Sequence, residues 1–296
     1  MKKTLFTGSG VAIVTPYTEN GVDFDMLGKL IEFQIAGGTD AIVICGTTGE
    51  ASTMPDEEHL DVIRYGVEKV AGRIPVIAGT GSNDTTHGIR LSKRAQELGA
   101  DGLLLVTPYY NKASQKGLYE HFSKTAQSVD IPVILYNVPS RTGVTIAIDT
   151  YKKLAEIDNI VAVKEASGNL AYASQIRAAC GDKLDLYSGN DDVIVPMLSI
   201  GGKGVISVLA NVLPQETHDI CARYFAGDVQ GSMELQLKYM DLIAALFIEV
   251  NPIPVKAALG FMGFDCGKYR LPLCEMEEKN AAVLKEAMKG AGIALV

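Results

Sequence analysis

The sequence predicts a (β/α)8 barrel, also called a TIM barrel, with a C-terminal helical extension. Short apolar segments recur along the first two thirds of the chain, most of them about 25–35 residues apart, which is room for one strand and one helix. The segments are apolar throughout rather than alternating, as expected of parallel strands that are covered on both faces. Eight of them occur, which is the number that closes this kind of barrel.

An open doubly wound sheet is the alternative architecture. No GxGxxG follows the first apolar segment and no GxxxxGK[ST] occurs in the sequence, so the phosphate-binding signatures of open sheets are missing. The sequence therefore favours the closed barrel. The predicted strands are, in chain order, Val11–Val14, Ala41–Cys45, Val76–Ala78, Leu103–Val106, Val133–Tyr136, Ile160–Val163, Leu184–Tyr187 and Gly204–Val208.

Helical patterns fill the intervals between these strands. The helix after the second strand has the clearest start signal. Thr53 and Asp56 have the spacing of a capping box, and Pro55 between them suits a first helical turn.

The strand pattern ends at about residue 227. Met233–Ile248 and Glu275–Met288 are predicted to be helices, and Pro252 and Pro254 interrupt the pattern between them. We expect residues 1–226 to form a catalytic barrel domain and residues 227–296 a helical region packed against it.

The composition excludes several classes of partner. The chain of 296 residues has a net charge of -8 and no basic run, which argues against nucleic acid and anionic membranes as partners. No apolar run approaches the roughly 20 residues of a membrane span, and Gly8 and Gly10 interrupt the N-terminal apolar stretch. The five cysteines form no CxxC pair, which favours a reduced, cytoplasmic protein.

Metal and hydrolase sites lack support in the sequence. The four histidines are scattered, no HExxH gives paired ligand spacing, and no GxSxG gives a nucleophile elbow. We expect a site without metal.

Lys164 is the sharpest candidate for chemistry. Active sites of these barrels lie at the C-terminal ends of the strands, and Lys164 directly follows the apolar strand Ile160–Val163. Burial lowers the pKa of a lysine and makes its free amine a nucleophile toward carbonyl carbon. A surface position is the usual outcome for lysine, and that alternative stays open at this point.

Neighbouring strand ends supply complementary groups. Tyr136 ends the preceding strand and can relay protons beside Lys164 if its phenol is hydrogen-bonded to a hydroxyl, for which Thr47 and Thr48 are candidates. Arg141 could hold a carboxylate with its two-pronged guanidinium. A purely structural tyrosine and a solvated loop arginine are the alternatives.

Four motifs together resemble those of the dihydrodipicolinate synthase family, within the pyruvate-dependent class I aldolases. The resemblance covers essentially the whole chain, although Ala113 stands where the family commonly has proline. The motifs are GTTGE at Gly46–Glu50, TPYYNKASQ at Thr107–Gln115, YNVPSRTG at Tyr136–Gly143 and VKEASG at Val163–Gly168.

The resemblance implies a Schiff-base-forming lyase of lysine and diaminopimelate biosynthesis. Lys164 would form an imine with pyruvate, and the derived enamine would attack L-aspartate 4-semialdehyde, with no further cofactor. The chain would be a homo-oligomer, usually a tetramer built as a dimer of dimers. Sister enzymes, N-acetylneuraminate lyase and the 2-keto-3-deoxy sugar acid aldolases, remain alternatives, as does a non-catalytic barrel that binds a 2-oxo acid.

The resemblance also implies roles for individual residues. Tyr136, Thr47 and Tyr110 would form a proton relay, with Tyr110 contributed by a neighbouring subunit. The residues expected to bind substrate are Thr48 at the pyruvate carboxylate, Arg141 at the carboxylate of the semialdehyde, and Gly189 and Ile206 through their backbone. Arg141 separates the synthase from its sisters, which commonly lack it.

The resemblance extends to a regulatory site. Many family members are inhibited by lysine at a dimer interface, and Asn83, His59 and Tyr109 fit that pattern. His87, however, stands where the pattern has a glutamate, so the partner for an effector ammonium is absent. Asp56, at a histidine position of the pattern, has a simpler role in a helix cap. We expect weak or absent inhibition by lysine.

Overall fold

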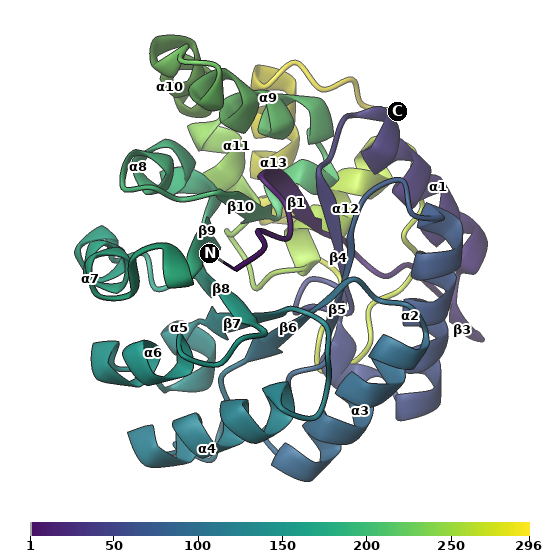
Figure 1. Ribbon diagram of the computed structural model, residues 1–296. Helices are drawn as coiled ribbons and strands as arrows, with labels where there is room; N and C mark the ends of the chain where they lie inside the picture. The colour runs from purple at the N-terminus through teal and green to yellow at the C-terminus, as the bar shows by residue number, and fades with distance from the viewer. Residues whose placement is uncertain (1) are drawn as a thin grey trace.

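The computed structural model describes residues 2–296 and shows a closed barrel of eight parallel strands (Figure 1). Strands that follow one another along the barrel pair in parallel, and the last closes onto the first. The predicted fold class is confirmed. The barrel strands are β1 (Gly8–Ala12), β4 (Ala41–Ile44), β5 (Val76–Gly79), β6 (Gly102–Val106), β7 (Val133–Asn137), β8 (Ile160–Glu165), β9 (Asp185–Ser188) and β10 (Gly204–Ser207).

The first strand is the one whose predicted position was wrong by several residues. β1 begins at Gly8 rather than Val11, because its glycines let the backbones of β1 and β10 approach closely. A Cβ atom added to Gly204 would lie 1.8 Å from the carbonyl oxygen of Gly8. An apolar-run criterion does not detect a strand that begins with glycine. Every later predicted strand agrees with the structure to within two residues at each end.

A ring of helices surrounds the barrel in Figure 1. Four of them are preceded by N-cap residues whose side chains accept a hydrogen bond from a backbone N–H of the first turn, namely Asp23, Asp84, Ser114 and Asn169. The helices of the ring are α1 (Phe24–Ala36), α2 (Asp56–Val70), α3 (Thr85–Glu97), α4 (Gln115–Ala126), α5 (Pro139–Thr142), α6 (Ile148–Leu154), α7 (Leu170–Cys180), α8 (Ile194–Ser199) and α9 (Pro214–Phe225).

Several shorter elements complete the loops. A two-stranded hairpin, β2 (Tyr17–Thr18) and β3 (Gly21–Val22), precedes α1. Single 3-10 turns are η1 (Ala51–Thr53), η2 (Gly181–Lys183), η3 (Asp191–Val193) and η4 (Leu209–Asn211).

The predicted capping box at the start of α2 is wrong. The helix begins at Asp56, and its N-cap residue Pro55 offers no side-chain bond. Thr53 instead ends η1, where its hydroxyl donates to the carbonyl oxygen of Glu50 at 3.0 Å. The hydroxyl is therefore used inside the turn that precedes the helix.

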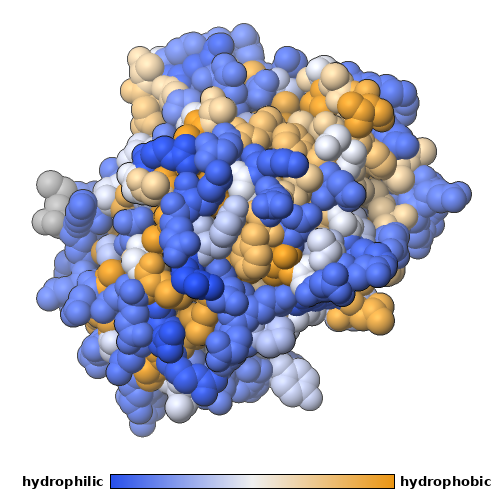
Figure 2. All heavy atoms as spheres, turned by 90° about the vertical axis from the view of Figure 1, so that its right-hand side faces the viewer, coloured by the Kyte–Doolittle hydropathy of each residue, from blue (hydrophilic) through white to orange (hydrophobic). Residues whose placement is uncertain are grey.

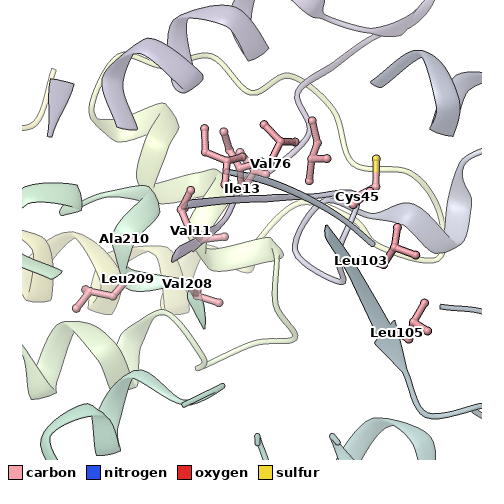
Figure 3. Close-up of a cluster of buried hydrophobic side chains, with 14 of the residues drawn as sticks. Val11, Ile13, Cys45, Val76, Leu103, Leu105, Val208, Leu209 and Ala210 are labelled. Carbon is pink, nitrogen blue, oxygen red and sulfur yellow. The ribbon is translucent and has the colours of Figure 1, made fainter. Parts of the chain in front are cut away.

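Two apolar layers hold the barrel together. Side chains such as Val43, Ile77 and Ile134 fill its interior. A larger cluster lies between the strands and the helices, and Figure 3 shows part of it, with Val11 and Leu103 among the labelled residues. Alternate residues of each strand thus face opposite layers, and both faces are covered.

The C-terminal region is helical, but its elements differ from the prediction. The helix predicted at Met233–Ile248 is two helices that meet at Tyr239. Pro252 and Pro254 do not interrupt a helix; they lie at the start of one, where a missing N–H costs no helical bond. The helices are α10 (Val229–Lys238), α11 (Met240–Ala245), α12 (Ile253–Phe261) and α13 (Glu278–Gly290).

The boundary at residue 226 between barrel and helical region stays a prediction, and Met1 lies outside the described residues. Within residues 2–296, no helix combines the length and hydropathy that a bilayer span requires.

Figure 2 shows the side of the molecule that carries α1, α2 and α3 in Figure 1, where hydrophilic side chains are interspersed with smaller apolar areas.

Gly204→Ala should destabilise the barrel, because a Cβ has no room against Gly8 and the φ of Gly204 is +153°. Gly290→Ala is the matched control, since a Cβ at Gly290, the last residue of α13, meets no atom within 4 Å. Thermal unfolding should show a lower Tm for the first variant and an unchanged or slightly higher Tm for the second. Equal Tm values would contradict the close approach of β1 and β10.

Candidate active site

Lys164 and Tyr136 lie side by side at the ends of adjacent strands. The register of β7 and β8 pairs Tyr136 with Lys164, so their side chains face the same side of the sheet. The Lys164 Nζ is 4.3 Å from the centroid of the Tyr136 ring. Both residues are buried, with exposed fractions of 6% and 7%. The alternative of a surface lysine is thereby excluded.

Burial lowers the pKa of Lys164 from 10.5 to about 8. The Asp191 carboxylate acts in the opposite direction, and the Arg141 guanidinium lowers the pKa further. A group with a pKa of about 8 is unprotonated in roughly a tenth of molecules at pH 7, against less than a thousandth for an ordinary lysine. The site thus holds a usable fraction of free amine.

The pKa of Tyr136 shifts in the opposite direction. Burial raises the pKa of its phenol, while Arg141 and the Thr47 hydroxyl lower it in part. The phenol therefore stays protonated near neutral pH and can donate or pass a proton.

The Gly46–Glu50 turn carries both threonines. The residue before the turn and the last residue of the turn are left-handed although neither is glycine, with φ of 55° at Cys45 and 57° at Glu50. Such positions cost about 1–3 kcal/mol each and persist only where the surroundings hold them. Thr47 is half-buried, and Thr48 is buried with its hydroxyl accepting a bond from the Asn251 amide at 3.0 Å.

A cavity of about 320 Å³ brings the groups together at the strand ends. Thr47, Tyr136 and Arg141 belong to its lining. Lys164 is not among the lining residues, but its amine lies against the ring of Tyr136, which is. Arg141 lies on α5, exposed, and donates to the carbonyl oxygen of Asn251 at 3.2 Å.

Gly189 follows β9, which pairs with the Lys164 strand β8, and Ile206 lies on β10, the next strand around the barrel. The Gly189 N–H donates to the carbonyl oxygen of Glu165 at 2.7 Å, and a Cβ there would lie 2.6 Å from that of Ala166. Ile206 is buried in β10 opposite Gly10. The position of Gly189 therefore requires a residue without a side chain.

Comparison with known proteins identifies the family to which the chain belongs. A family model described as "Dihydrodipicolinate synthetase family" matches residues 5–291. The chain belongs to the dihydrodipicolinate synthetase family. A 4-hydroxy-tetrahydrodipicolinate synthase of Acetivibrio thermocellus is 60% identical over 293 residues, which are 99% of this chain and 100% of the relative.

Solved structures of the family have the same fold. The crystal structure of dihydrodipicolinate synthase from Aquifex aeolicus is 48% identical with a TM-score of 0.96, covering 98% of this chain and 99% of that one. The chloride-inhibited enzyme from Acinetobacter baumannii, complexed with pyruvate, is 47% identical with a TM-score of 0.95, covering 98% of this chain and 100% of that one.

Tyr110 stands apart from the other residues expected in the relay. Its side chain is 90% exposed, and it does not line the cavity. Among residues 2–296, no hydrogen bond joins it to Tyr136 or Thr47. Its backbone is left-handed with φ of 71°, as is that of Lys112 with φ of 51°, so the loop holds Tyr110 outward in a specific conformation.

Sequence reasoning missed two residues of the site. Asp191 is buried, and its carboxylate accepts the N–H groups of Val208 at 3.1 Å and Leu209 at 2.9 Å. It directly follows the polar residues after β9, and this position beyond a strand end is the signal that could have indicated it. Asn251, which contacts Thr48 and Arg141, has no such signal because it lies in the C-terminal region.

The residues expected to form a regulatory site are only partly brought together. His59 and Tyr109 line the cavity, whereas Asn83 does not. His59 is bonded to the carbonyl oxygen of Gly79 at 2.9 Å, and burial lowers its pKa. Asp56 is paired with His87 at 2.8 Å and with Arg90. Its carboxylate is thus engaged within the chain.

L-Lysine should bind weakly or not at all, because Arg90 and the His87 imidazole already occupy the Asp56 carboxylate and His87 supplies no negative charge. Isothermal titration calorimetry with L-lysine checks this expectation. His87→Glu should strengthen binding by adding an acid beside the cavity, whereas His87→Gln should not. Tight binding to the unaltered protein would contradict the expectation.

Proposed function

We propose that the chain is a lyase that forms 4-hydroxy-tetrahydrodipicolinate, the product after which its relatives are named, from pyruvate and L-aspartate 4-semialdehyde. The observation that carries the proposal is the buried amine of Lys164, whose pKa is lowered to about 8 beside Tyr136. The identity of 60% to a synthase over the whole chain supports the same reaction.

The amine of Lys164 performs the covalent chemistry. It adds to the keto carbon of pyruvate, and the keto oxygen leaves as water to give an imine. Loss of a methyl proton gives an enamine, whose carbon attacks the aldehyde carbon of the second substrate. The aldehyde oxygen takes up a proton and becomes the hydroxyl group of the product, while the lysine nitrogen again forms an imine. The amino group of that substrate then adds to the imine carbon, closes the ring and releases Lys164 as a free amine. Pyruvate bound as the imine makes a further cofactor unnecessary.

The surrounding residues move protons and hold carboxylates. Tyr136, protonated near neutral pH, delivers the proton with which the keto oxygen leaves as water, and Thr47 hydrogen-bonds the phenol. Thr48 and the backbone of its turn receive the pyruvate carboxylate. Arg141 binds the carboxylate of the semialdehyde at the exposed edge of the cavity. The backbone at Gly189 and Ile206 completes the pocket.

A second subunit completes the relay in this proposal. Tyr110 is 90% exposed and Tyr109 38% exposed, which is unusual for adjacent aromatic residues beside an active site and suits an interface. The loop would place Tyr110 in the neighbouring site, so a dimer is the smallest active form. Assembly of two dimers into a tetramer and a cytoplasmic location remain predictions from the sequence.

Arg141→Ala tests the assignment of the second substrate. In an assay coupled to dihydrodipicolinate reductase, its kcat/KM for the semialdehyde should fall about tenfold to hundredfold, because a bidentate charged bond is lost. The KM for pyruvate should change little. Arg94→Ala, which removes an exposed arginine paired with Glu97, is the control and should behave as the unaltered protein.

Two outcomes would contradict the proposal. Cleavage of N-acetylneuraminate or a 2-keto-3-deoxy sugar acid, without turnover of the semialdehyde, would assign the chain to a sister aldolase. Absence of any turnover by the unaltered oligomer would point to a non-catalytic barrel.

A further inference from the structure

A buried ion pair joins the Gly46–Glu50 turn to the C-terminal region. The Lys256 Nζ donates to the Glu50 carboxylate at 2.8 Å, and the two side chains are 1% and 0% exposed. Lys256 lies on α12, 206 residues further along the chain. The reaction described above uses neither residue.

Both charges of the pair have further fixed partners. The Lys256 Nζ also donates to the carbonyl oxygen of Lys268 at 2.7 Å, and it lies 4.9 Å from the ring centroids of Tyr17 and Tyr269. The second carboxylate oxygen of Glu50 accepts the N–H of Arg270 at 3.4 Å. Neither charged group can therefore rotate freely or exchange partners with water.

A buried ion pair of this kind contributes little to the free energy of unfolding. Removing two charges from water offsets most of their mutual attraction, and apolar residues of similar volume often stabilise a fold as well or better. What a fully bonded buried pair does provide is a fixed distance and direction between the two segments that carry it.

The Gly46–Glu50 turn, which the ion pair holds at this distance, has a strained backbone. Glu50 has a left-handed backbone, with φ of 57°, at one end of the turn that presents Thr47 and Thr48. Such a conformation persists where neighbouring contacts impose it. The same C-terminal region contacts the turn a second time, through the bond from Asn251 to Thr48. Two contacts from one region thus fix both the end and the middle of the turn.

We propose that Glu50 and Lys256 are positioning residues for the turn that binds pyruvate. The ion pair holds Thr47 and Thr48 where they meet the substrate carboxylate and the phenol of Tyr136. The C-terminal region is then part of the catalytic apparatus and not only a cover for the barrel. This inference rests on the proposed function, because it assigns a role in pyruvate binding to groups that do not touch pyruvate.

Three variants separate positioning from folding: Glu50→Gln, Lys256→Met and the double variant. Each single variant leaves one buried charge without its partner and should lower the Tm. The double variant removes both charges and should recover much of that loss. Its KM for pyruvate should nevertheless stay about tenfold or more above that of the unaltered protein, because small misplacements of binding groups have effects of this size. The KM for the semialdehyde should change much less.

The exposed pair of Glu286 and Lys289 on α13 provides the matched control, with its atoms 2.7 Å apart. Glu286→Gln with Lys289→Met makes the same chemical changes in the same region and should alter neither Tm nor KM.

A double variant with recovered Tm and an unchanged KM for pyruvate would overturn the inference and leave the pair a purely structural role. If the double variant does not fold, Lys256→Arg keeps the charge but changes its reach; a raised KM for pyruvate supports positioning, and an unchanged one overturns it. Failure of the unaltered protein to turn over pyruvate with the semialdehyde would overturn the proposed function instead.

Discussion

The exclusion of water from the amine of Lys164 is the constraint on which the rest of the structure depends. An ammonium group is strongly hydrated, and full burial can lower a lysine pKa by several units. Here burial is the largest influence on a pKa of about 8, and the Asp191 carboxylate limits the shift. The closed barrel supplies the burial, since paired strands surround Lys164 on both sides and the interior is filled with apolar side chains.

The same constraint explains how the neighbouring groups are arranged. Asp191 is itself held by two backbone N–H groups after β10, so its charge stays at a fixed place relative to Lys164. Tyr136 packs against the Lys164 ammonium and keeps its proton because it is buried too. The groups proposed to bind carboxylates, Thr48 and Arg141, lie beyond the strand ends, on the Gly46–Glu50 turn and on α5. From the C-terminal region, Asn251 contacts both of them, and Lys256 pairs with Glu50 at the end of that turn.

The sequence predicted the site residues where an apolar strand pattern is followed by a polar residue at the strand end. Lys164 and Tyr136 end apolar segments, and parallel strands bring such ends to one face, so their proximity could be predicted before any contact was known. The position of β1 could not, because close backbone approach through Gly8 and Gly204 leaves no apolar run. Nor could the contact between Asn251 and Thr48, because a bond spanning 203 residues has no periodic signal. The helix start at Pro252 and Pro254 was misjudged because proline both ends and begins helices.

Trapping of pyruvate tests the central claim most directly. With pyruvate and cyanoborohydride, the reduced adduct should appear on the peptide that contains Lys164, and Lys164→Arg should abolish it. Because the folded protein lowers the pKa of this amine, the initial rate should rise with pH up to about 8 and then level off. No adduct on that peptide, or a rate that still rises tenfold per pH unit near pH 10, would contradict the account.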